Sequence, residues 1–176
     1  MMIAKRVSKI YFTSLLLVLL MAVAVTADDS AVSRATLAGL QGVKVVVEEL
    51  PPNVQQFAAS AGLTSAQLKR DVEKKLQEGK IRAVEEKNWL NVPGRPVLSV
   101  VVNTHEKEKY WYAYDIKFEL RQLAYLEANP KVRTLAGTWS LSITGVANTG
   151  NLQVIRQDAG VLAERFVKAY KAANGK

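Results

Sequence analysis

The sequence predicts an α+β fold, a mostly antiparallel sheet of four or five strands with two helices packed on one face. Residues 106–122, "EKEKYWYAYDIKFELRQ", place large apolar side chains at every second position, as in a strand with one dry face. Residues 64–79 and the segment from residue 152 onward repeat apolar side chains every three or four positions, as amphipathic helices do. Because each element has one apolar side, we expect both helices to cover one face of the sheet.

The chain begins with the pattern of a secretory signal peptide. A basic start is followed by the uncharged apolar run 10–25, and small residues precede a cleavage site after Ala27. We therefore expect residues 1–27 to be removed and the protein to be periplasmic or secreted. A retained membrane anchor is the alternative, since the run of about 16 residues is a little short of a span. The chain has no cysteine, which excludes a lipid-modified cysteine and disulfides, so its stability must come from a core.

Length and charge limit the remaining possibilities. The 176-residue chain carries a net charge of +8, and removing the three basic residues of the signal leaves +5. We expect a flexible lead-in at 28–40, one α+β domain at 41–173 and a tail at 174–176. No lysine or arginine cluster is dense enough to indicate nucleic-acid binding. A mild attraction to anionic envelope components, such as lipid head groups or acidic glycans, fits this charge better.

The predicted element order is strand, helix, four strands, helix. Thr64 and Gln67 form a capping box at the start of the first helix, and Gly79 is expected to end it in a left-handed conformation. Apolar alternation and β-branched residues predict strands in five segments, which are 41–50, 81–86, 97–104, 106–126 and 133–147.

The strand within 106–126 has two distinct sides. The expected helix-facing side chains are those of Tyr110, Tyr112, Tyr114, Ile116, Phe118 and Leu120. Those expected to face water belong to Trp111, Ala113, Asp115, Lys117, Glu119 and Arg121. After Arg121 the apolar phase slips by one residue, which predicts a β-bulge at 121–122 that keeps the core face continuous. In the last strand, Leu135 and Gly137 are expected to share a face with Trp139.

The candidate contact patch is Lys109, Tyr110 and Trp111, near the tip of the hairpin. An indole that points toward water is unfavourable unless a partner covers it. The alternative is that Trp111 packs on threonines of a neighbouring strand and has only a structural role.

The sequence contains no pattern that predicts catalysis, a cofactor or a metal site. His105 lies beside Glu106 and Glu108, but on a solvated tip where a metal site would be loose. Asp115 and Glu119 would lie roughly 13 Å apart along a strand, too far for the carboxylate pair of a glycosidase. Cysteine nucleophiles, nucleophile elbows and glycine-rich phosphate loops are absent. We therefore do not expect an enzyme.

The segments "TLAGLQGVKVVVEEL", "GLTSAQLKRDVEKKLQEGKI", "PVLSVVVNT", "YAYDIKFELRQ" and "GTWSLSITG" resemble a family of small, exported bacterial α+β proteins. The element order is also similar to two envelope modules, the lipopolysaccharide-transport lipoprotein and the amino-terminal domain of TolB. The resemblance implies an adaptor or assembly module that binds another envelope protein. Two alternatives stay open: a carrier of a small molecule or lipid between helices and sheet, and an enzyme with an unfamiliar site.

Overall fold

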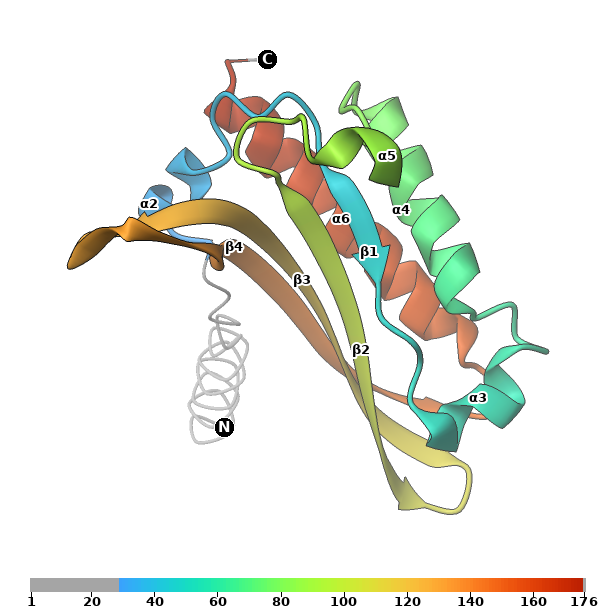
Figure 1. The fold of residues 1–176 in the computed structure, drawn as a ribbon. Coiled ribbons are helices and arrows are strands. Elements are labelled where there is room, and N and C mark those ends of the chain that lie inside the picture. Colours follow the sequence, from blue (N-terminus) through green and yellow to red (C-terminus); the bar gives the residue numbers. More distant parts are fainter. Residues whose placement is uncertain (1–28, 176) are drawn as a thin grey trace, which may run out of the picture.

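The computed structural model describes residues 29–175, so the predicted signal peptide at 1–27 lies outside the described residues. This part of the chain folds into four strands and five helices around one core (Figure 1). In chain order these are α2 (Ala31–Ala35), β1 (Lys44–Val47), α3 (Pro52–Ala58), α4 (Ser65–Glu78), α5 (Glu86–Trp89), β2 (Val97–Glu108), β3 (Trp111–Leu126), β4 (Asn129–Asn148) and α6 (Gln153–Ala173).

The sheet is mixed, with the order β1-β2-β3-β4. The β2–β3 and β3–β4 pairs are antiparallel, whereas β1 pairs with β2 in parallel. The prediction of a mostly antiparallel sheet is therefore wrong at β1, whose connection to β2 runs through α3, α4 and α5. Such a long crossover returns the chain in the same direction, which allows parallel pairing.

The predicted strand at 81–86 is also wrong. Only one parallel bridge forms, between Val43 and Ala83. The Val43 N–H donates to the Arg82 carbonyl at 3.0 Å, and the Val43 carbonyl accepts from the Val84 N–H at 2.9 Å. Pairing stops there because α5 begins at Glu86, the last residue of the segment that the sequence predicts as a strand.

The two long helices, α4 and α6, lie together on one face of the sheet, as predicted (Figure 1). Thr64 caps α4 by accepting a hydrogen bond from the Gln67 N–H at 3.1 Å. The α4 stripe that meets the core consists of Leu68, Val72 and Leu76, all buried. Lys75 pairs with Glu164 of α6 at 2.7 Å on the outer side of the two helices.

The end of α4 differs from the prediction. Gly79 has a φ of −75°, and the left-handed residue is Lys80, at φ 60°. Glycine is required at position 79 for another reason. A Cβ atom there would lie 2.5 Å from Cγ1 of Val167, because α6 passes directly against the end of α4.

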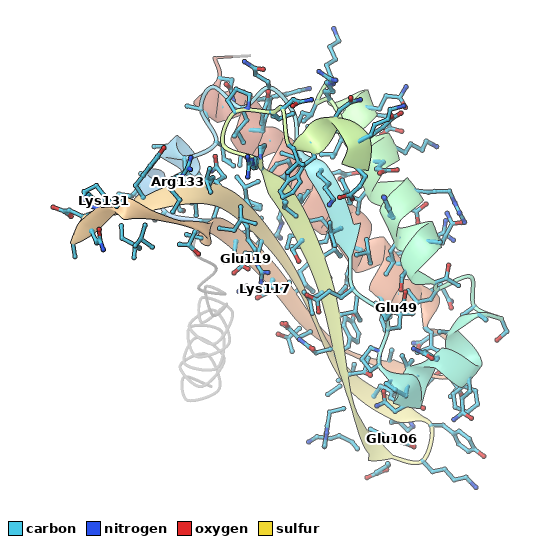
Figure 2. The ribbon with its side chains drawn as sticks, viewed as in Figure 1. Glu49, Glu106, Lys117, Glu119, Lys131 and Arg133 are labelled. Carbon is cyan, nitrogen blue, oxygen red and sulfur yellow. The ribbon has the colours of Figure 1, made fainter. Side chains whose placement is uncertain are left out.

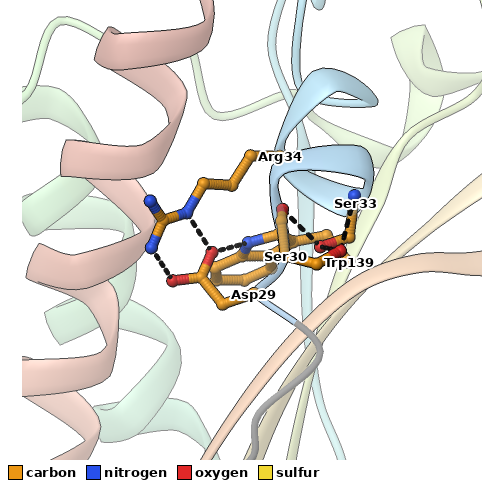
Figure 3. Close-up of polar contacts among 5 residues, drawn as sticks. All are labelled: Asp29, Ser30, Ser33, Arg34 and Trp139. Atoms are coloured by element: carbon orange, nitrogen blue, oxygen red, sulfur yellow. Dashed lines mark hydrogen bonds and ion pairs between the residues drawn. The ribbon is translucent and has the colours of Figure 1, made fainter.

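The expected flexible lead-in is instead folded onto the domain (Figure 3). Ser30 caps the short helix α2 by accepting from the Ser33 N–H at 3.1 Å. Just before α2, Asp29 accepts hydrogen bonds from the Trp139 indole at 2.8 Å and from Nε of Arg34 at 2.7 Å. Leu37 after it is fully buried. Leu37 packs in the core and Asp29 bonds to Trp139, so both depend on residues that are distant in the sequence. Local composition therefore predicted a flexible segment.

The predicted tail also begins with an ordered contact. The Asn174 side chain donates to the Leu37 carbonyl at 3.0 Å and accepts from the Gly39 N–H at 2.9 Å. This side chain therefore holds the loop between α2 and β1, and the folded unit runs from Asp29 to Asn174.

The alternation predicted for β3 is confirmed from Tyr112 to Leu120. All the helix-facing side chains of this stretch are buried, and they are Tyr112, Tyr114, Ile116, Phe118 and Leu120. Tyr110 is an exception, since it lies in the turn before β3 with a φ of 74° and is 47% exposed. We call the opposite side of the sheet, which the described helices leave uncovered, the open face.

The predicted bulge exists, but the extra residue belongs to β4. Leu120 pairs with Trp139 and Arg121 pairs with Gly137, so Thr138 is the unpaired residue. Thr138 is held in place because its Oγ1 accepts from Nε2 of Gln122 at 2.8 Å. Beyond this point β3 keeps its phase, and the partner strand changes phase instead.

This bulge overturns the prediction of a continuous core face. Leu123 and Tyr125 keep the orientation of Arg121, toward the open face, and Leu135 joins them because it pairs with Leu123. Leu135 and Gly137 thus lie on the face opposite Trp139. We call residues 121–137 the distal ribbon; it extends beyond the helices at the far end of β3 and β4 (Figure 1).

Candidate functional site

The open face offers the largest uncovered stretch of sheet for binding. Its charged centre is on β3, where Glu119 lies between Lys117 and Arg121 along the strand. Figure 2 labels Lys117 and Glu119. Nζ of Lys117 donates to Oε1 of Glu119 at 2.8 Å, and Nε of Arg121 donates to Oε2 at 2.6 Å. The Lys117 hydrogen bond, with help from Arg121, lowers the pKa of Glu119. A carboxylate held ionised in this way is a poor proton donor.

The second carboxylate of the open face is separate from Glu119. Asp115 accepts a hydrogen bond from Oγ1 of Thr144 on β4 at 3.3 Å. Lys117 stands between the two acids along β3, so they do not form a pair. Glu119 is thus paired within its own strand and Asp115 is bonded across to β4, an arrangement expected for a solvated sheet face.

The tip of the β2–β3 hairpin contains a shallow hollow of about 550 Å³ on the open face. Its apolar floor is formed by Trp111 and Ala113 of β3 and by Val146 of β4. The Trp111 side chain is 47% exposed and that of Val146 is 62% exposed. Lys107 and Glu108 form the charged rim. We call this site the Trp111 hollow.

The structure separates the three residues of the predicted contact patch. Trp111 lies in the hollow on the open face, whereas Tyr110 is turned toward α3. The Tyr110 ring meets Phe57 edge-on, with centroids 6.3 Å apart, and Nζ of Lys109 lies 5.1 Å from the Tyr110 ring centroid. Lys109 and Tyr110 thus belong to the helix side of the tip, and only Trp111 belongs to the hollow.

Two surfaces were not predicted from the sequence, the Trp111 hollow and the distal ribbon. The proximity of Val146 to Trp111 depends on the register that pairs Ala113 with Val146, which the sequence alone does not give. The sequence signal that existed was the valine itself, because the preceding alternate positions of β4 carry hydroxyl side chains, from Thr138 to Thr144. The distal ribbon is the other missed surface, because the strand that carries the bulge could not be identified.

Metal binding finds no support in the geometry of residues 29–175. His105 is exposed on β2, and no cluster of three or more potential ligands is arranged around a common point in this range. Within the same range, no helix is both long and apolar enough to cross a membrane.

The space between helices and sheet is filled with side chains. Trp139 of β4 and Phe166 of α6 are buried there in edge-to-face contact, with centroids 5.2 Å apart. The buried Tyr112 ring closes the end near α3, where its hydroxyl donates to the Asn53 carbonyl at 3.2 Å. A carried ligand would have to displace this packing.

Comparison of the sequence with models of protein families found no match, and comparison with curated proteins found none either.

Proposed function

We propose that the protein is a non-catalytic module of the cell envelope, exported to the periplasm or secreted, that binds another envelope protein at the Trp111 hollow. The observation that carries this proposal is the half-exposed indole of Trp111 beside the exposed Val146, on the face that no described helix covers. Tryptophan is among the residues enriched at the energetic centres of protein interfaces, where an apolar core is surrounded by a polar rim.

The position of β4 supports a specific mode of binding. β4 is the last strand in the sheet order, so its outer edge has no neighbouring strand within the described residues. An extended peptide added along this edge would have every second side chain on the open face. Beside Val146, such a side chain would reach the Trp111 hollow, while the peptide backbone would continue the sheet.

Binding on the open face requires less rearrangement of the protein than binding in its interior. Binding of a small molecule between helices and sheet would require the packed rings of Trp139 and Phe166 to separate. An enzyme built on Asp115 and Glu119 would need these acids freed from Thr144, Lys117 and Arg121. The Trp111 hollow requires no rearrangement of this kind.

Site-specific photo-crosslinking in the native host tests the proposal. A photoreactive phenylalanine analogue at Val146 should give a discrete adduct with one envelope protein. The same analogue at Val161, an exposed valine on the outer side of α6, is the matched control and should give none. Trp111→Ala should abolish the Val146 adduct with little change in the melting temperature. No adduct at Val146, or one that persists in Trp111→Ala, would refute the proposal.

A further inference from the structure

We infer that the distal ribbon is a second interaction surface, and that it binds the surface of a bilayer containing anionic phospholipids. This inference is independent of the proposed function, since the ribbon and the Trp111 hollow lie at opposite ends of β3. It rests on the apolar exposure, the charge and the shape of residues 121–137.

Large apolar side chains are concentrated on the ribbon without a core to cover them. Tyr125 is 64% exposed, Leu126 46%, Val132 42% and Leu135 43%. They lie beyond the bulge, where the two strands have left the helices (Figure 1). Tyr125 and Leu126 are adjacent in β3, so their side chains point to opposite faces. The ribbon is therefore apolar on both sides, unlike the rest of the sheet.

The same segment is basic. It contains Arg121, Lys131 and Arg133 against a single acid, Glu127, for a net charge of +2. Figure 2 shows Lys131 and Arg133 at the projecting end of the ribbon. The Arg133 guanidinium lies 6.0 Å from the Tyr125 ring centroid. Within residues 29–175 neither Lys131 nor Arg133 has an ion-pair partner, so both charges are available to an anionic surface.

These properties favour a lipid surface over a protein or a second copy of the chain. A protein docked on one face of a two-stranded ribbon would cover either Tyr125 or Leu126, whereas a bilayer interface surrounds an inserted tip on all sides. Tyrosine and leucine fit the boundary between head groups and acyl chains, and the long basic side chains reach back to the phosphates. A second copy would bring Lys131 and Arg133, which are unpaired within residues 29–175, against the same cations of its partner.

Insertion can be measured directly, because the chain has no cysteine. Ala128→Cys at the ribbon tip and Ala66→Cys on α4 are both exposed positions, and each gives a single thiol for an environment-sensitive dye. With mature protein and vesicles of phosphatidylcholine containing phosphatidylglycerol, the dye at residue 128 should brighten and shift to the blue. The dye at residue 66 should not change. A silent dye at residue 128, or equal changes at both positions, would overturn the inference.

Charge variants test the anionic requirement. Lys131→Gln with Arg133→Gln should weaken partitioning into these vesicles about 30-fold, because each cation near an anionic surface contributes about fivefold. Lys74→Gln with Lys168→Gln removes the same charge from exposed helix positions and should leave partitioning nearly unchanged. Equal binding to pure phosphatidylcholine, or equal losses in both double variants, would contradict the inference. Retention on immobilised polyglutamate without vesicle binding would assign the ribbon to an acidic protein and overturn it.

Discussion

The ring of Tyr114 on β3 covers the backbone of Gly145 on β4, its partner in the sheet. A Cβ atom on Gly145 would lie 2.5 Å from Cζ of Tyr114. The Tyr114 hydroxyl continues past the glycine and donates to Oδ2 of Asp158 on α6 at 2.5 Å. Burial, with help from this hydrogen bond, raises the pKa of Tyr114, so the hydroxyl stays a donor at neutral pH. The missing side chain at residue 145 thus lets one tyrosine connect the sheet to α6.

Gly145→Ala should therefore destabilise the protein. The added methyl group overlaps a fully packed ring, and overpacking of this kind typically costs about 1–3 kcal/mol. Gly160→Ala is the matched control, since a Cβ atom there meets nothing within 4 Å and the residue lies inside α6. It should stabilise by roughly 0.5–1 kcal/mol, because alanine favours a helix over glycine. Urea denaturation measures both changes, and a neutral Gly145→Ala would show that the ring can move aside.

The features that the sequence predicted are those governed by local periodicity. The alternation from Tyr112 to Leu120 placed β3 and its core face correctly, and the Thr64 cap placed the start of α4. Parallel pairing of β1 was not predictable in this way, because an apolar strand does not encode the direction of its neighbour. The same holds for residues 29–40, whose order depends on partners such as Trp139, far away in the sequence.

The bulge shows most clearly what the periodicity of a sequence cannot predict. The phase slip after Arg121 correctly located an irregularity, but periodicity in one strand does not say which strand holds the extra residue. The answer depends on Thr138, whose hydroxyl and carbonyl are bonded to Gln122 and Thr36. Placing the extra residue in β4 rather than β3 moves Leu123, Tyr125 and Leu135 from the core to the open face. The candidate lipid surface is therefore a consequence of the position of this one extra residue in β4.

Alanine substitutions of the neighbouring residues Trp111 and Tyr112 distinguish a binding role from a structural role at the hairpin tip. Tyr112→Ala removes a ring that is 1% exposed, and it should cost about 3–5 kcal/mol. Trp111→Ala removes a half-exposed ring on the other face and should cost less than about 1 kcal/mol. Thermal and urea denaturation of both variants check this difference. A large loss of stability in Trp111→Ala would mean that the indole is part of the fold and would remove the basis for the hollow as a protein site.

The pH dependence of stability should reflect Asp29. The Arg34 hydrogen bond, followed by that of the Trp139 indole, lowers the pKa of Asp29. A carboxyl whose folded pKa is depressed stabilises fully above its unfolded pKa of about 4, and that contribution falls as the pH drops through the folded pKa. Asp29→Asn should therefore be less stable than wild type at neutral pH, and the difference should shrink at about pH 3.

Urea denaturation at the two pH values measures this linkage. Glu127→Gln is the control, because Glu127 is exposed and has no ion-pair partner within residues 29–175. It should change stability little at either pH. A penalty for Asp29→Asn that is the same at both pH values would mean that Asp29 acts only as a hydrogen-bond acceptor for Trp139, without a contribution from its charge.

The end of α4 allows two neighbouring substitutions with opposite expected effects. Gly79→Ala should destabilise by about 1–3 kcal/mol, since its Cβ would lie 2.5 Å from Val167 Cγ1 in the α4–α6 contact. Lys80→Gly should stabilise by up to about 1 kcal/mol, because Lys80 holds a left-handed conformation, at φ 60°, that glycine adopts without strain. Combining Gly79→Ala with Val167→Ala tests the cause. The double variant should lose less stability than the sum of the two single variants, because Val167→Ala makes room for the methyl group added at residue 79 and that methyl group fills part of the space left by Val167. Additive losses would show that the contact with Val167 is not what excludes a side chain at residue 79.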